Sequence, residues 1–457
     1  MERPGESLWQ ARSSRPESRA PLPGDVDVDV AIVGAGYTGL WTAFALAETD
    51  PSLRIVVVDA EEVGYGASGR NGGWVSAKLA GLDRLLADPR GRPEAVRLQR
   101  ELIATVDRIG EVVEAEGIDC GFQKGGAVVA ATRPPHIERL RKGVELRHRV
   151  GFGEEDFRWL DPAEAAEHLR PSVLLGASYT PHCAVVDPLR LVRGLAAAVE
   201  RRGVTVHEHT RVWRLGPGRV DTSHGTIRAE LVVRATEAYT TRLSGHRRDV
   251  VPLYSLMVAT PPLPPETWEE IGLDDRQAFS DGRRLVIYGQ RTDDDRIAFG
   301  GRGAPYHFGS RIDPSFDRDP EVFARLRATL AELFPVLDGV ELDHGWGGPL
   351  GLSRDWLPSV IYDRDTRIAW AVGYAGQGVA AANLVGRILA DLVLDRDSDL
   401  VGLPIVGHRP RSWEPEPLRW LGINAGILLT VSADRHEERT GRQARWRGAL
   451  LHRLVGL

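Results

Sequence analysis

The feature that most constrains the fold of this chain is a glycine turn, GAGYTG, which opens at Gly34. The run VDVDVAIVG before the turn is typical of a strand buried on both faces of a parallel sheet, and GLWTAFALAE after it has the apolar spacing of a helix. Gly34 permits the tight turn, Gly36 allows a pyrophosphate to approach the backbone, and Gly39 lets the helix pack against the strand. The next apolar run, LRIVVVD, ends in Asp59, whose carboxylate suits a ribose hydroxyl. We therefore predict a dinucleotide-binding βαβ unit of the Rossmann type.

The composition of the chain excludes several other classes of protein. A net charge of −6 argues against a nucleic-acid partner, which usually requires a basic domain. Cys120 and Cys183 provide neither a disulfide framework nor a metal-binding spacing, so we predict no metal site. The N-terminal segment has no signal-peptide pattern, and the apolar stretch from Leu421 is shorter than the ~20 residues that span a bilayer. We expect a cytoplasmic protein without a transmembrane segment, and the oligomeric state stays open.

The rest of the sequence alternates between two kinds of pattern. Buried strands and helices of the Rossmann kind return at 189–235 and again at 367–394, whereas 250–303 is typical of half-buried antiparallel strands. We therefore predict an α/β protein with a discontinuous Rossmann-type nucleotide-binding domain and a second domain rich in antiparallel sheet. Long helices are expected at 93–117 and 323–334. The expected divisions are an N-terminal arm that Leu8 and Trp9 anchor (1–24), the nucleotide-binding domain (25–83, 185–249 and 340–410), the second domain (84–184 and 250–339) and a helical C-terminal tail (411–457).

Two further glycine-rich segments accompany the first turn. GYGASGRNGGW, from Gly64 to Trp74, lies just beyond Asp59, and its glycines permit close approach of a ligand to the backbone. GYAGQGV, from Gly373 to Val379, precedes an apolar helix whose N-terminus would stabilise negative charge. The alternative interpretations are a flexible surface loop for the first segment and an ordinary capped turn for the second.

Seven blocks, in order along the chain, resemble a known family: DVAIVGAGYTGL, VGYGASGRNGGW, EHTRVWRL, LVVRATEAYT, YGQRTDDDRIAFGG, WGGPLGLSRDWLP and GYAGQGVAAANLVGRILADLVL. The resemblance is to the D-amino-acid-oxidase-like superfamily of FAD-dependent oxidoreductases, in its glycine and sarcosine oxidase branch, and GASGRNGG points to its γ-glutamylputrescine oxidase-like members. It implies an FAD site made by Gly34, Gly36, Thr38, Gly39, Asp59, Ala60, Ser68, Gly69, Asn71, Val212, Ala235, Thr236, Gly376, Gln377 and Gly378.

Two departures from the family bear on the cofactor. Some relatives tether FAD through a histidine in the loop after the second strand or through a late cysteine, but this loop has Arg70 and Asn71, and no cysteine follows Cys183. We therefore predict non-covalent FAD. Sarcosine-oxidase-like members also use a lysine above the flavin to help activate oxygen. Lys78 is the candidate here, and the alternative is a solvated surface lysine.

The resemblance implies that a primary or secondary amine gives hydride to flavin N5, that the resulting imine hydrolyses, and that O2 is reduced to H2O2. The substrate would be an amino acid, a polyamine derivative or an aminophosphonate. Two alternatives stay open: a dehydrogenase that passes electrons to a carrier, and a catalytically silent FAD-binding assembly factor. Arg302 is a candidate clamp for a substrate anion. The other candidate pocket residues, each of which has a structural alternative, are Tyr254, Tyr288, Tyr306, His307, Trp346 and Arg354.

The C-terminal tail is basic. From Arg435 onward it carries six arginines against two glutamates, behind the apolar stretch LRWLGINAGILL. One interpretation is a helix that binds a membrane surface or a partner. The other is a helix packed on the FAD-binding domain, with a solvated end.

Overall fold

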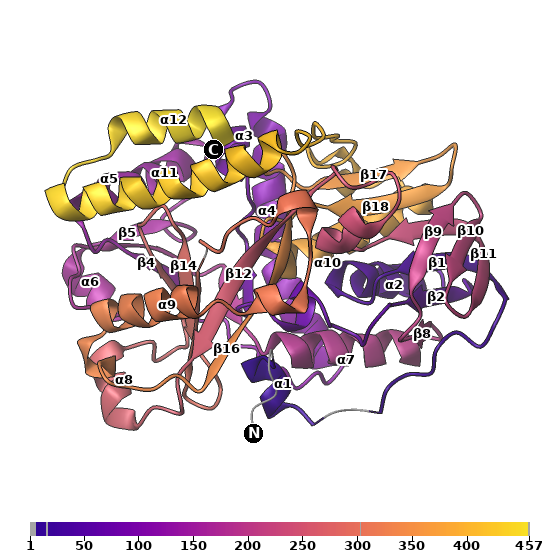
Figure 1. Cartoon of the computed structure of the whole chain (residues 1–457), viewed down its shortest axis with the longest axis horizontal. Coiled ribbons are helices and arrows are strands. Elements are labelled where there is room, and N and C mark those ends of the chain that lie inside the picture. Colours follow the sequence, from indigo (N-terminus) through magenta and orange to yellow (C-terminus); the bar gives the residue numbers. More distant parts are fainter. Residues whose placement is uncertain (1–5, 15–16, 302, 456–457) are drawn as a thin grey trace.

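The computed structural model describes residues 6–14, 17–301 and 303–455, and contains two large sheets that lie next to each other (Figure 1). The first sheet has the strand order β17-β18-β11-β1-β2-β8, and β1 pairs in parallel with both β11 and β2. This arrangement confirms the predicted Rossmann-type core. Its strands are β1 (Val26–Val33), β2 (Ile55–Val58), β8 (Thr205–His207), β11 (Gly225–Arg234), β17 (Ser359–Asp363) and β18 (Ile368–Val372), with the β9 (Val212–Gly216) and β10 (Arg219–Thr222) hairpin beside β11.

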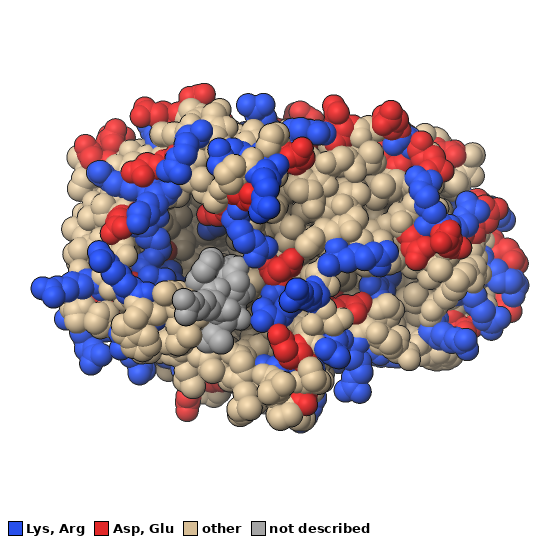
Figure 2. Space-filling view, turned by 90° about the horizontal axis from the view of Figure 1, so that it is seen from above, with Lys and Arg blue, Asp and Glu red and all other residues tan. Residues whose placement is uncertain are grey.

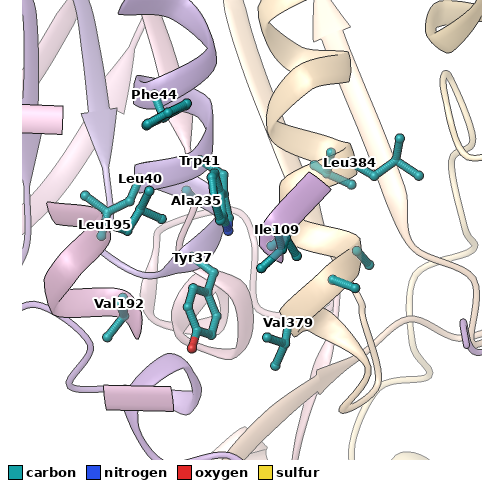
Figure 3. Close-up of a cluster of buried hydrophobic side chains, with 14 of the residues drawn as sticks. Tyr37, Leu40, Trp41, Phe44, Ile109, Val192, Leu195, Ala235, Val379 and Leu384 are labelled. Carbon is teal, nitrogen blue, oxygen red and sulfur yellow. The ribbon is translucent and has the colours of Figure 1, made fainter. Parts of the chain in front are cut away.

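The helices α2 (Tyr37–Thr49), α7 (Pro188–Arg201) and α10 (Gly378–Val393) pack with the first sheet. Figure 3 shows Trp41 of α2 and Leu384 of α10 in one apolar cluster, and Ile109 of α4 (Arg92–Ala115) joins it. A Cβ on Gly386 of α10 would lie 2.6 Å from the backbone carbon of Trp41. Gly386 therefore permits the close approach of α10 to α2.

The second sheet has the order β16-β12-β15-β14-β13-β4-β6-β5, and its only parallel pair among the described strands is β13 with β4. The predicted antiparallel strands between 250 and 303 are confirmed as β12 (Val251–Ala259), β14 (Ile287–Arg291) and β15 (Ile297–Gly301). The other strands are β4 (Ala127–Ala130), β5 (Arg158–Leu160), β6 (Ala177–Thr180), β13 (Ala278–Asp281) and β16 (His344–Leu352). In addition, β3 (Trp74–Ser76) and β7 (Cys183–Val185) form a separate two-stranded sheet.

The structure confirms some of the remaining expectations and differs from others. The N-terminal arm contains a short helix, α1 (Leu8–Arg12), and buries Leu8 and Trp9, which confirms them as its anchors. The strand β16 lies inside the segment expected in the nucleotide-binding domain, but it pairs with β12 in the second sheet. The helix expected at 323–334 is confirmed as α9 (Pro320–Leu333). The sequence did not predict the remaining helices, which are α3 (Leu82–Ala87), α5 (Pro134–Arg149), α6 (Pro162–Ala166) and α8 (Pro265–Ile271).

The C-terminal tail forms two helices, α11 (Leu418–Thr440) and α12 (Arg445–Val455). The start of α11 contacts the segment assigned to the nucleotide-binding domain, where Arg419 donates to the carbonyl of Arg247 at 3.3 Å, while its later part contacts α5 and the segment after β13. The Asp434 carboxylate accepts from the backbone N–H groups of Arg284 and Leu285, at 2.9 and 2.8 Å. Both helices lie on the outer side of the second domain (Figure 1). No helix of the described residues is long and apolar enough to cross a membrane.

Candidate active site

A single cavity of about 790 Å³ connects the first glycine turn to the second sheet. That volume lies within the range of pockets that bury cofactors and small ligands. Most of the predicted cofactor residues border it, although they come from four separate parts of the chain. These are Gly34, Gly36, Thr38, Asp59, Ala60, Ser68, Asn71, Val212, Ala235, Thr236, Gly376, Gln377 and Gly378.

The first turn depends on its glycines for steric reasons. Gly34 has a φ of +114°, and a Cβ there would lie 2.4 Å from the carbonyl oxygen of Ala235. A Cβ on Gly39 would lie 2.0 Å from the carbonyl oxygen of Gly34. Gly39 does not border the cavity. It therefore acts by letting α2 start directly behind the turn, which presents the N–H groups of the helix to the cavity.

Asp59 lies at the carboxyl end of β2 and borders the cavity. Its carboxylate accepts hydrogen bonds from the backbone N–H groups of Ala35, at 2.7 Å, and Glu61, at 3.0 Å. Burial raises the pKa of Asp59 to about 6, against the opposing effect of these two hydrogen bonds. The carboxylate thus links the first turn to the segment after β2, at the edge where a ribose would lie.

The second glycine-rich segment is an ordered wall of the cavity. The Ser68 hydroxyl accepts from the backbone N–H of Tyr37 at 2.9 Å, at the start of α2. The side chain of Asn71 donates to the carbonyls of Ala67 and Ser68 and accepts from the N–H of Gly73 at 2.7 Å. Gly69 packs behind the segment, since a Cβ there would lie 2.3 Å from the carbonyl oxygen of Gly64. The segment is therefore held by its own side chains and by the helix that it faces.

Three side chains hold this segment in place, two of them from outside it. The indole N–H groups of Trp9 and Trp346 donate to the carbonyls of Asn71 and Arg70, each at 2.9 Å. The Arg70 guanidinium forms an ion pair with Asp317 and donates to the carbonyl of Gly347 at 2.9 Å. Trp346 therefore supports the cavity wall rather than lining the cavity.

The third glycine turn is tied to the rest of the site by Glu237. Its carboxylate accepts from the backbone N–H groups of Gly351 (2.7 Å), Gly373 (3.1 Å) and Tyr374 (3.2 Å). Burial raises the pKa of Glu237 to about 7, and the three hydrogen bonds oppose that shift. Glu237 thus joins the ends of β11, β16 and β18 just before α10 begins.

The start of α10 faces the cavity. Gln377 and Gly378, where the helix begins, both border it, and the Thr38 hydroxyl makes a 2.9 Å hydrogen bond with that of Tyr374. The Gln377 Oε1 atom is buried and has no hydrogen-bond partner among the described residues. A ligand N–H would satisfy this acceptor, and the positive end of the helix dipole would stabilise negative charge on the ligand.

Two of the predicted substrate residues border the cavity, Tyr288 and Lys78. The Tyr288 hydroxyl makes a 2.8 Å hydrogen bond with that of Ser255, and its ring packs edge-on against Trp74. Lys78 is exposed in the loop between β3 and α3. Arg302 lies outside the described residues.

The other predicted substrate residues do not border the cavity and have structural partners instead. Tyr254 is buried in the core of the second domain, where the His307 ring lies edge-on against it. The Tyr306 hydroxyl donates to Glu416 at 2.8 Å, and Arg354 forms an ion pair with Glu414.

Two polar side chains that the sequence did not identify, Gln99 and His182, border the cavity near Lys78. The Gln99 side chain donates to the carbonyl of Ala77 at 2.8 Å, and His182 pairs with Asp156 at 2.8 Å. The carbonyl of His182 accepts from the N–H of Ala77 at 3.1 Å, so Gln99 and His182 flank the same residue. Gln99 Oε1 and His182 Nδ1 are both buried without a hydrogen-bond partner among the described residues. No motif surrounds either residue, so the sequence carried no signal for them.

The fold and the cavity are those of a flavoprotein-type dinucleotide-binding enzyme, and comparison with known proteins specifies the family. A family model described as FAD dependent oxidoreductase matches residues 29–392. The chain belongs to this family, FAD is therefore its cofactor, and non-covalent binding is typical of the family.

The chain is also similar to individual curated proteins. It is 30% identical over 410 residues to a probable oxidoreductase OrdL of Rhizobium meliloti, covering 87% of this chain and 90% of the relative. It is 29% identical over 420 residues to gamma-glutamylputrescine oxidoreductase of Escherichia coli, covering 88% of this chain and 93% of the relative. Among solved structures, glycine oxidase from Geobacillus kaustophilus superposes with a TM-score of 0.70 at 24% identity, over 84% of this chain and 100% of that one.

Proposed function

We propose that this protein is an amine oxidase that binds FAD along the described cavity. The pyrophosphate would lie at the start of α2, beside Gly36, and the adenosine ribose at Asp59. The flavin would lie between the 64–74 segment and the start of α10. The relatives include a gamma-glutamylputrescine oxidoreductase and a glycine oxidase, which supports an amine as the substrate.

The observation that carries the proposal is the position of Gln99 and His182. Both border the same cavity as the cofactor residues, and each has a buried polar atom without a partner among the described residues. Leaving such an atom unsatisfied costs about 1–3 kcal/mol. An amine supplies the N–H group that Gln99 Oε1 lacks, so its binding would recover that cost.

FAD, when bound, would supply the acceptor for a hydride from the α-carbon of the amine, and water would hydrolyse the imine product. The chain positions the amine and its surroundings. Gln99 would hold the amine nitrogen, while the Tyr288 ring and Met257 would close one side of the cavity. The start of α10 would stabilise negative charge that develops on the cofactor. Lys78 would help O2 to react, with H2O2 as the product.

Peroxide measurement tests the proposal against the two alternatives. The FAD-loaded protein is mixed with amino acids, polyamine derivatives and aminophosphonates in air, and H2O2 is followed with a coupled peroxidase. An oxidase forms peroxide in proportion to the amine consumed. A dehydrogenase reduces an artificial electron acceptor without forming peroxide, and a silent assembly factor does neither.

The role of Lys78 is tested by Lys78→Met, which should slow the reaction of the reduced enzyme with O2 while leaving its reduction by amine unchanged. Lys124→Met is the matched control, because Lys124 pairs with Asp107 and does not border the cavity. An unchanged oxygen rate in Lys78→Met would remove that role.

A further inference from the structure

The two C-terminal helices carry an unusual concentration of exposed apolar side chains. The described residues leave ten large hydrophobic side chains exposed, and six of them lie on α11 and α12. Leu421 is 53% exposed and Leu428 is 70% exposed. Large apolar side chains that gather on one surface mark an interaction site, whereas scattered ones do not. The six are Leu418, Trp420, Leu421, Leu428, Trp446 and Leu450, and we call this group the C-terminal patch.

Geometry places much of the patch on a common surface. Leu418, Leu421 and Leu428 are separated by three and by seven residues, which puts their side chains on one face of α11. Trp446 and Leu450 are four residues apart and share a face of α12 in the same way. Arg447 donates to the Ser432 hydroxyl at 3.1 Å and so holds α12 against α11.

The acidic side chains of these two helices face the body of the protein, whereas several of their arginines face solvent. The three acidic residues of the pair are all engaged with the body of the protein. Asp434 accepts from the backbone after β13, Glu437 pairs with Arg139 and Arg284, and Glu438 pairs with Arg133 at 3.1 Å. By contrast, four arginines of the same segment are exposed to solvent: Arg435, Arg439, Arg442 and Arg445. The outward surface is therefore apolar and positively charged, although the whole chain has a net charge of −6.

We propose that the C-terminal patch and its arginines dock the protein on an anionic lipid surface. Leucine and tryptophan side chains flanked by arginines are the combination that holds a helix at a lipid–water interface, where the apolar groups enter the acyl boundary and the cations meet the headgroups. A second copy of this chain fits the surface less well, because a face-to-face contact would bring the arginines of the two copies together. The negative charge of the lipid is what complements them.

The inward side of α11 contacts residues that border the cavity. Arg139 borders the cavity and is the ion-pair partner of Glu437 on α11. Val286, which is 37% exposed, also borders the cavity and directly follows the two residues whose N–H groups bind Asp434. Figure 2 views the molecule from the side on which α11 and α12 lie, and shows a hollow in that face with blue arginine and lysine side chains around it. Docking would therefore bring the lipid surface beside this part of the cavity.

Vesicle sedimentation tests the proposal and does not depend on catalysis. The FAD-loaded full chain is mixed with vesicles of phosphatidylcholine alone, or with added phosphatidylglycerol, and then sedimented. We expect binding to the anionic vesicles that weakens as salt increases. The double variant Leu421→Asn with Leu428→Asn should bind about tenfold more weakly or worse, because it removes two apolar groups from the interface. Arg439→Gln and Arg442→Gln should each weaken binding about fivefold.

The matched control is Val173→Asn, which changes an apolar side chain of 47% exposure outside the patch and should bind as the unaltered chain does. Bound FAD and the melting temperature show whether each variant is folded. The proposal fails if the anionic vesicles do not bind the protein, or if the leucine variant binds them equally well. It also fails if sedimentation velocity shows a dimer that the leucine substitutions dissociate while vesicles bind nothing, because the surface then belongs to a second copy of the chain.

Discussion

Replacement of Glu237 by glutamine should change how the stability of the protein depends on pH. Burial raises the pKa of this carboxyl from 4.5 to about 7, which corresponds to about 3 kcal/mol of stability. The native state keeps a proton that the unfolded chain releases. This contribution is therefore fully present below about pH 4.5 and is lost as the pH rises through about 7. For a chain of this length, 3 kcal/mol corresponds to about 3 °C in the melting temperature.

The assay is thermal unfolding with excess FAD at about pH 5 and about pH 8, so that both proteins are compared in the FAD-loaded form. The unaltered protein should lose about 3 °C more than Glu237→Gln over this interval. Asp59, whose pKa burial also raises, remains in both proteins and cancels in the comparison. Glu114→Gln, on the exposed face of α4, controls for the loss of a carboxylate. Parallel melting curves for the unaltered protein and Glu237→Gln would refute the reasoning.

Three further predictions concern the cofactor. Gly39→Ala should yield protein with little FAD and a lower melting temperature, because its Cβ would lie 2.0 Å from a backbone oxygen. Its control is Gly422→Ala, which has open space around it in α11 and should keep FAD and raise the free energy of unfolding by about 0.5–1 kcal/mol. Trp9→Ala should cost about 3–5 kcal/mol and raise the FAD dissociation constant, measured by flavin fluorescence, since Trp9 is buried and holds the carbonyl of Asn71. Acid denaturation should release the yellow colour into the supernatant, and a yellow pellet would show a covalent bond.

The parts of the fold that the sequence predicted are those with local signals. Apolar periodicity and glycine placement within a short window specify the Gly34 turn with its flanking strand and helix. They also specify β18, where the Rossmann pattern appears again. These segments form the nucleotide-binding core because parallel strands with helical crossovers have few ways to pack.

The predicted substrate residues on β12 illustrate where the sequence is insufficient. Successive side chains of a strand point to opposite faces, so the choice of face depends on which side the cavity lies. Tyr254 points into the core of the second domain, while Ser255 and Met257, its neighbours along β12, border the cavity. An aromatic side chain with a hydroxyl was a reasonable candidate, but nothing local distinguishes the two faces of a strand that is buried on both.

The residues that hold the site together were also beyond a local analysis. Arg70 meets Asp317 and Glu237 meets Gly351 across more than a hundred residues of sequence, and both contacts exist only once the two sheets are assembled. Gln99 lies on a long helix whose pattern predicts only an apolar face. Its amide borders the cavity because α4 packs against the segment after β3, where Gln99 donates to the carbonyl of Ala77.

Anaerobic reduction of the bound flavin by amines is the most direct test of the central claim, because it isolates the first chemical step from the choice of electron acceptor. The FAD-loaded protein is mixed without oxygen with a panel of amines and with the corresponding alcohols, and the visible absorbance of the flavin is followed. We predict that at least one amine removes this absorbance while its matched alcohol does not. A flavin that no amine reduces, or that the alcohol reduces equally well, would contradict the assignment of this protein as an amine oxidase.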